Sequence, residues 1–163
     1  MSRELDSYLR IGERVNLGSH LFTAEEIIDY ASEFDPQEFH VDPAKAADSL
    51  FGGLCASGWH TCAMWMRHNT AERDGGGAPR WEGEGAEPEK GPSPGFRNLR
   101  WMKPVFAGDT ITFYRTSISY RPLASRPGWI VLLAKGEAFN GDGQQVMEME
   151  NSVLYKYSPT NSA

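Results

Sequence analysis

The sequence has few cysteines, no long apolar run and no excess of basic charge. Among its 163 residues are only two cysteines, and 16 Lys and Arg stand against 22 Asp and Glu, a formal net charge of −6. Duplex nucleic acid and anionic membranes both attract a basic surface. No stretch approaches the roughly 20 apolar residues that span a bilayer, and residues 1–21 lack a signal-peptide core. We therefore expect a cytosolic protein with no nucleic-acid or membrane partner.

The two cysteines are not expected to form a disulfide. A helix over residues 54–69 would place Cys55 and Cys62 on one face, about 10 Å apart at ~1.5 Å per residue. That separation exceeds the reach of a disulfide bond.

The length and the 40% apolar content fit one globular domain over residues 1–163. Within it, residues 71–95 hold seven of the 17 glycines and four of the 10 prolines. We expect this Gly/Pro/Glu-rich segment to be a flexible surface loop. Trp81 is the one sign that part of the segment packs against the rest of the protein.

The first half of the chain carries helix signals. Thr23 and Glu26 form a capping box that opens a helix over residues 24–34, and Pro36 follows its end. A second short helix is expected over residues 43–50, with proline at its first turn.

A third helix is expected over residues 54–69. Apolar and small residues recur there at helical spacing and predict a buried face: Phe51, Leu54, Cys55, Gly58, Trp59, Cys62, Trp65 and Met66. Small residues in its first turns indicate close approach to another backbone, as in a sheet wrapped around the helix.

The second half of the chain has the sequence patterns of β-strands. Alternating apolar and polar residues, or β-branched and aromatic runs, mark residues 96–105, 109–119, 129–139 and 145–157, and residues 14–21 add an edge strand. Asn140-Gly141-Asp142-Gly143 is a hairpin signal. The fold class is therefore α+β, with about five antiparallel strands on one long helix.

Polar residues crowd in the loop over residues 34–42. Asp35 and His40 lie five residues apart there, and a carboxylate and an imidazole facing one water can share general acid and base roles. Two structural readings stay open, since an Asp before Pro often ends a helix and a loop His is often a hydrogen-bonded structural group.

Several ordered motifs resemble one family. They are Asp35 and His40, Val41-Asp42-Pro43, Phe51-Gly52-Gly53-Leu54-Cys55-Ala56-Ser57-Gly58-Trp59-His60-Thr61, Pro94-Gly95, Leu99-Arg100-Trp101, Pro104-Val105 and Gly108-Asp109-Thr110. Together with the hairpin they resemble the MaoC-like dehydratases, the (R)-specific enoyl-CoA hydratases of hotdog fold. The resemblance covers most of residues 22–157.

The resemblance implies a hotdog fold, in which an antiparallel sheet wraps one long central helix, and a homodimer or higher homo-oligomer. It implies reversible addition of water to a trans-2-enoyl thioester, on CoA or an acyl carrier, giving a 3-hydroxyacyl thioester. Asp35 and His40 would activate the water, and the Gly58 N–H would polarise the thioester carbonyl. No cofactor or metal is expected.

The resemblance also points to substrate-binding residues. The family usually has Asn-Pro where this chain has Gln37 and Glu38, and His where it has Ser57. We expect Gln37 and Ser57 at the substrate. Trp59 is expected at the acyl pocket or in the core, and Arg100 at a CoA phosphate or as a solvated strand-end charge.

Some alternatives remain open at this stage. Glu38 points to solvent or raises the pKa of Asp35 by like-charge repulsion. His60, Met64 and His68 share helical spacing but lack the carboxylate or cysteine pairs of a metal site. For the whole protein, the alternatives are an acyl-CoA thioesterase and a non-catalytic acyl-binding subunit.

Overall fold

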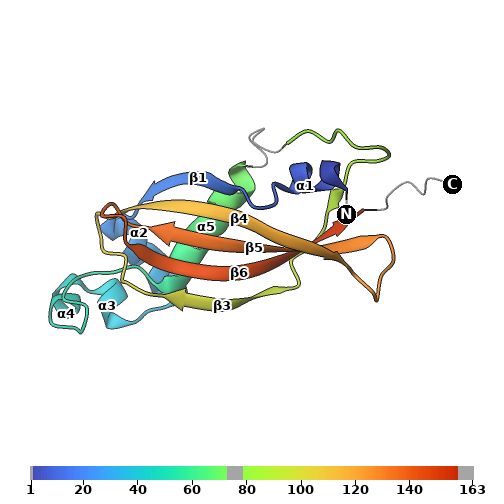
Figure 1. The fold of residues 1–163 in the computed structure, drawn as a ribbon. Helices are drawn as coiled ribbons and strands as arrows, with labels where there is room; N and C mark the ends of the chain where they lie inside the picture. The colour runs from blue at the N-terminus through green and yellow to red at the C-terminus, as the bar shows by residue number, and fades with distance from the viewer. Residues whose placement is uncertain (1, 73–78, 158–163) are drawn as a thin grey trace.

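The protein is built on one curled antiparallel sheet (Figure 1). Its structure, a computed structural model, describes residues 2–72 and 79–157. The sheet order is β1-β4-β5-β6-β2, and β3 also pairs with β6. The strands are β1 (Arg14–Leu21), β2 (Glu89–Lys90), β3 (Gly95–Trp101), β4 (Thr110–Pro122), β5 (Trp129–Phe139) and β6 (Gln145–Lys156). Five long strands are thus joined by the two-residue β2.

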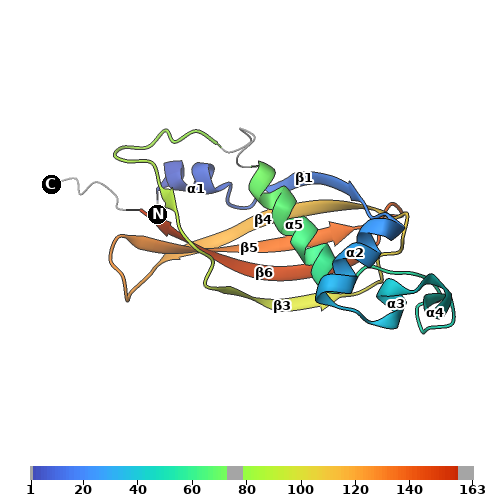
Figure 2. The ribbon, with the colours of Figure 1, turned by 180° about the vertical axis from the view of Figure 1, so that it is seen from behind.

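One long helix crosses a face of this sheet, as both views of the ribbon show (Figures 1 and 2). It is α5 (Gly58–Glu72), and the shorter helices are α1 (Arg3–Leu9), α2 (Ala24–Phe34), α3 (Glu38–Val41) and α4 (Pro43–Ala47). The expected hotdog arrangement, a sheet wrapped around one central helix, is therefore confirmed.

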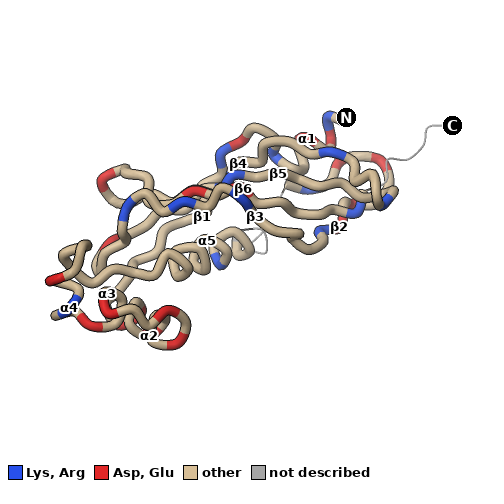
Figure 3. Tube along the Cα trace, turned by 90° about the horizontal axis from the view of Figure 1, so that it is seen from below, with Lys and Arg blue, Asp and Glu red and all other residues tan. Residues whose placement is uncertain are grey.

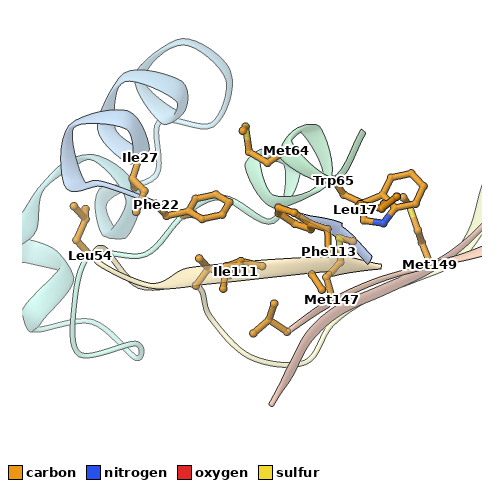
Figure 4. Close-up of a cluster of buried hydrophobic side chains, with 14 of the residues drawn as sticks. Leu17, Phe22, Ile27, Leu54, Met64, Trp65, Ile111, Phe113, Met147 and Met149 are labelled. Carbon is orange, nitrogen blue, oxygen red and sulfur yellow. The ribbon is translucent and has the colours of Figure 1, made fainter. Parts of the chain in front are cut away.

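The core lies between α5 and the sheet (Figure 4). Side chains of β5 alternate strictly between buried and half-buried positions, because successive residues of a strand face opposite sides. The inward side chains of β4 and β6, among them Phe113 and Met147, meet Trp65 of α5 and Phe22. All four are fully buried.

Three elements have the bounds that the sequence predicts, namely α2, β1 and β5. The second short helix ends at Ala47 rather than at residue 50, and β3 ends at Trp101 rather than at residue 105. The helices α1 and α3 were not predicted. Within the loop that carries His40, α3 is a single turn.

The predicted start of the long helix at residue 54 is wrong, since α5 begins at Gly58. The preceding segment is bound to another part of the chain: Cys55 bridges Phe106, and the Ala56 N–H donates to the Val105 carbonyl at 2.8 Å. These contacts occupy backbone groups that a helix would need.

The predicted buried stripe is also wrong at two positions. Trp59 is 50% exposed and Met66 42% exposed, whereas Trp65 is fully buried as predicted. The later helix start sets the face that meets the sheet, and its buried members are His60, Thr61, Met64, Trp65 and Asn69. Cys55 lies outside the helix, and both cysteines are free thiols.

Part of the segment 71–95 has defined contacts. Its strand β2 pairs with β6, and Trp81 packs edge-on against Tyr8 and Tyr157. Residues 73–78 lie outside the described residues, and the flexibility expected of the segment stays a prediction.

Acidic residues gather at the end of the molecule that carries α2 and α3, as the charge-coloured trace shows (Figure 3). Glu25 and Glu26 lie in the first turn of α2, and Glu38 begins α3. In the described part of the chain, no helix has both the length and the apolar character needed to cross a bilayer.

Candidate active site

Asp35 caps the C-terminal end of α2 and is held by two side chains. Ser57 Oγ donates to Asp35 Oδ2 at 2.7 Å, and Gln37 Nε2 donates to Oδ1 at 2.8 Å. The Asp35 N–H closes the last helical turn on Ala31 at 2.8 Å, and Pro36 cannot continue the helix. The carboxylate is thereby fixed in place, with both oxygens already accepting a hydrogen bond.

His40 lies on the single turn of α3 and is 6% exposed. Its Nδ1 is 2.6 Å from the Cys55 carbonyl oxygen. Because a carbonyl oxygen can only accept, Nδ1 carries a proton and donates it there. In the neutral ring Nε2 is therefore the unprotonated nitrogen, and it is the one that faces Asp35.

The two groups face each other without a short contact. His40 Nε2 lies 3.5 Å from Asp35 Oδ2. An ionised carboxylate and an unprotonated imidazole nitrogen are both acceptors, so they can hold the two hydrogens of one water molecule. A carboxylate and an imidazole placed in this way can act as general bases toward such a water.

The pKa of Asp35 lies below its ordinary value. Burial raises it, but the hydrogen bonds from Ser57 and Gln37 and the nearby His40 outweigh burial. Asp35 is therefore ionised at neutral pH, the form in which it can accept a proton.

We expect Ser57→Ala to raise the pKa of Asp35, since one hydrogen bond to the charged form is lost. The acidic limb of the pH dependence of kcat/KM should then move to higher pH, because Asp35 is protonated and inactive over a wider range. Ser57 also accepts from the Trp59 N–H at 3.3 Å, so the variant should lose about 0.5–2 kcal/mol of stability. Ser57→Thr keeps the hydroxyl and should restore the wild-type limb. If the acidic limb of the kcat/KM profile does not move in a folded Ser57→Ala protein, the hydrogen bond from Ser57 does not lower the pKa of Asp35.

Gly58 begins α5 immediately after Ser57. The Ser57 hydroxyl accepts from the Trp59 N–H, and the Ser57 carbonyl accepts from the His60 N–H. The Gly58 N–H is a first-turn donor that Ser57 does not accept from. A helix N-terminus favours negative charge through its free donors and its dipole. This position suits an oxygen that becomes an enolate.

The Trp101 side chain packs directly on Gly58. A Cβ built at Gly58 would lie 2.4 Å from Trp101 Cε2 and 2.6 Å from Cδ2. Only glycine allows this approach. Trp59 contacts the same indole edge-on, with ring centroids 5.3 Å apart.

These residues line one cavity of about 400 Å³. Its polar wall holds Asp35, Gln37, His40 and Ser57, and its other walls are largely aromatic or aliphatic: Phe39, Phe51, Trp59, Trp101, Met102, Val105 and Val146. A size of a few hundred Å³ and a few converging polar groups are typical of a site for a small organic ligand.

Comparison with known proteins agrees with this geometry. Residues 9–121 match the family described as MaoC like domain. The chain belongs to the MaoC-like domain family. It is 31% identical to a MaoC-like dehydratase from Rhodospirillum rubrum, with a TM-score of 0.72 over 91% of this chain and 94% of that one. It is 27% identical to the uncharacterized protein YdeM of Bacillus subtilis (strain 168), over 94% of this chain and 99% of that protein.

The fold is also that of an (R)-hydratase from A. caviae involved in PHA biosynthesis. That structure has a TM-score of 0.63 and 19% identity, over 91% of this chain and 96% of that one. At this level of identity the likeness shows a shared fold.

The MaoC-like domain brings most of the predicted site residues together. Asp35, His40 and Gly58 line the cavity, and so do Gln37, Ser57 and Trp59. Gln37 and Ser57 both bind Asp35, so their contact in this structure is with the carboxylate. Their expected contact with substrate stays a prediction.

Arg100 lies outside the cavity. Its guanidinium donates to Glu148 Oε1 at 2.7 Å and lines a separate groove with Lys135 and Glu150. Lys103 is the basic residue that lines the cavity of the MaoC-like domain. The expected role of Arg100 at a CoA phosphate stays a prediction.

Sequence reasoning missed Trp101, Phe39 and Phe51 as cavity residues. Phe39 precedes His40 and packs on it with ring centroids 4.5 Å apart, so its place beside the predicted dyad was a usable signal. Trp101 had no local signal, since its packing on Gly58 joins residues 43 positions apart.

Glu38 points away from the site. It is exposed and its carboxylate pairs with Lys45 at 2.5 Å. The pKa of Asp35 is lowered rather than raised, so the structure supports the alternative in which Glu38 points to solvent.

Three further titratable side chains, those of Cys55, His60 and His68, are not part of the dyad. Burial raises the pKa of the Cys55 thiol to about 11, so it stays protonated and is a poor nucleophile. His68 Nδ1 contacts the Leu17 carbonyl oxygen at 3.1 Å, and His60 Nε2 lies 3.7 Å from Glu26 Oε1. Among residues 2–72 and 79–157, no three His, Cys, Asp or Glu side chains gather in a way that could hold a metal ion.

Proposed function

We propose that this MaoC-like protein reversibly adds water across the double bond of a trans-2-enoyl thioester, giving a 3-hydroxyacyl thioester. One observation carries the proposal: the Asp35 carboxylate and the His40 Nε2 face each other at 3.5 Å in a cavity that also contains the start of α5. A general base and an N–H donor for an enolate oxygen are what this reaction requires.

In the proposed reaction, water donates one hydrogen bond to Asp35 and one to His40. One of these two residues takes a proton from the water, and the oxygen, which keeps its other hydrogen, attacks Cβ. Negative charge then moves through Cα to the thioester oxygen, where the Gly58 N–H stabilises it. The proton taken from water is delivered to Cα, either by the residue that accepted it or after passing between Asp35 and His40. Charges and protons balance, and no electron donor or acceptor is needed.

The charge distribution suggests how the thioester lies. Acidic residues lie on α2 and α3, whereas Lys103 lines the cavity beside Trp101 and Met102. We place the anionic CoA or carrier arm on the Lys103 side, and Cα and Cβ toward Asp35 and His40. Since both cysteines are free thiols, a cytosolic location fits the proposal.

The purified protein tests this function with crotonyl-CoA, with enoyl absorbance and free thiol followed in parallel. The proposal expects absorbance to fall without thiol release, and 3-hydroxybutyryl-CoA to appear. Thiol release would instead assign a thioesterase. No change with any enoyl thioester would favour a non-catalytic acyl-binding subunit.

We also propose a homodimer in which each chain supplies one domain. Strand β3 pairs with β6 along one edge, and at its two ends Phe96 and Trp101 are 56% and 44% exposed. An open edge with apolar side chains is suited to pairing with a second copy.

Light scattering should therefore give twice the 18.2 kDa chain mass. We expect Phe96→Glu to shift the protein toward the monomer, because it introduces charge at that edge. Glu82→Gln, in the segment between α5 and β2, is a control that should leave the mass unchanged. A wild-type monomer at high protein concentration would contradict the dimer.

A further inference from the structure

The active-site cavity ends a short distance from the dyad. Along α5 its lining includes Gly58, Trp59 and Thr61, and along β6 it includes Val146. The next inward-facing side chains, Trp65 on α5 and Met147 on β6, are fully buried and are not part of the lining. The space between the helix and the sheet is therefore closed beyond this point.

Trp65 closes it with a ring that is fixed at two places. Its Nε1 donates to the Tyr114 carbonyl oxygen at 2.9 Å. On β5, a Cβ built at Gly136 would lie 2.7 Å from Trp65 Cε2, so the indole rests on bare backbone. A hydrogen-bonded ring in such close contact has no free space into which to turn.

Neighbouring side chains complete this closed layer. Cys62 Sγ lies 3.4 Å from Met147 Sδ, just behind the cavity lining. Around Trp65 the core is filled by Leu17, Phe113 and Met149 (Figure 4). A ligand that grew in this direction would have to displace packed core side chains, which is costly.

We propose that Trp65 is a specificity-determining residue, which closes the inner end of the cavity and restricts the substrate to thioesters with short acyl chains. The inference rests on the proposed hydration of enoyl thioesters and names the acyl class. Trp65 itself stays outside the cavity lining. It acts by filling the space into which a longer chain would extend.

The first measurement compares trans-2-butenoyl-CoA with trans-2-octenoyl-CoA as substrates of the wild-type protein. We expect kcat/KM to be at least about tenfold higher for the butenoyl thioester, since pocket size commonly discriminates by that factor or more. Equal values, or a preference for octenoyl, would overturn the size limit while leaving the hydratase function standing.

Two variants then open the closed end. Trp65→Leu removes the indole, and Met147→Ala removes the side chain that contacts Cys62 behind the cavity lining. In either folded variant we expect the ratio of octenoyl to butenoyl kcat/KM to rise by about tenfold or more, mainly through a lower KM for octenoyl. Trp129→Leu, at the far end of β5 and outside the cavity lining, is the matched control and should leave the ratio unchanged.

Because a ratio is measured within one enzyme, a general loss of stability does not move it. An unchanged ratio in both folded variants would overturn the role of Trp65.

If neither thioester is hydrated, the proposed function fails, and equilibrium titration with the unreactive butyryl-CoA and octanoyl-CoA tests whether the cavity limits the length of the acyl chain. Tighter binding of butyryl-CoA supports the limit, whereas tighter binding of octanoyl-CoA, or none of either, overturns it. If both variants fail to fold, the preference of the wild-type protein for butenoyl-CoA or octenoyl-CoA decides whether the size limit holds.

Discussion

The Asp35→Asn variant is expected to lose enoyl-thioester hydration by a factor of about 10²–10⁴ while it remains folded, the range that general acid–base groups typically contribute. Asparagine has nearly the same shape and still offers an oxygen to Ser57 or Gln37. It cannot take a proton from water, and it carries no charge to hold the water against His40. The carboxylate accepts 2.7 Å and 2.8 Å hydrogen bonds that keep it ionised, and only that charged form is useful as a base.

Glu38→Gln is the matched control for this variant. It removes a carboxylate three residues away, but Glu38 faces solvent and pairs with Lys45. We expect activity within about twofold of wild type. Hydration rates for both variants should be compared after circular dichroism shows that each is folded. If Asp35→Asn keeps more than a tenth of wild-type activity, Asp35 is not the base.

Much of the fold could be predicted because its signals are local. The Thr23 half of the predicted capping box marks where α2 begins, since Thr23 Oγ1 accepts from the Glu26 N–H at 3.2 Å, whereas the Glu26 carboxylate contacts His20. Strict alternation in β5 reports the two faces of a strand directly. In both cases neighbouring residues alone decide the structure.

The start of α5 could not be read in the same way. Residues 54–57 have helical spacing of apolar groups, yet their backbone pairs with Val105 and Phe106, which lie about 50 residues further along the chain. A long-range backbone pairing outweighs a local pattern. The same limit explains why the predicted buried stripe included Trp59, which is half exposed and lines the cavity, the other place expected for it.

The site residues show the same difference between local and long-range signals. Asp35 and His40 were found because they stand in one short loop and match a family motif, and the structure brings them to 3.5 Å. The contacts that tune them are distant in sequence: Ser57 reaches Asp35 across 22 positions, and the Cys55 carbonyl reaches His40 across 15. The extended segment 54–57, which the sequence was expected to fold as helix, supplies both of these partners. Its departure from the helical pattern therefore positions the dyad.

Two substitutions at His40 separate its catalytic nitrogen from its structural one. His40→Asn places an amide nitrogen near the position of Nδ1, where it can still donate to the Cys55 carbonyl, and it removes Nε2. His40→Gln places an amide near Nε2 and gives up the donor to Cys55. The wild-type hydrogen bond from Nδ1 is 2.6 Å long and buried.

We expect both variants to lose hydration by about 10²–10⁴, because neither amide can accept a proton as imidazole does. Their stabilities should differ, since His40→Gln loses the donor to a buried carbonyl and that costs about 1–3 kcal/mol. Urea unfolding of the two variants and the wild type measures this difference. Hydration within tenfold of wild type in His40→Asn would remove Nε2 from the mechanism, and equal midpoints for the two variants would show that the Cys55 hydrogen bond does not fix the ring. Loss of activity in both, with loss of stability only in His40→Gln, is the pattern that a ring held at Nδ1 and reactive at Nε2 requires.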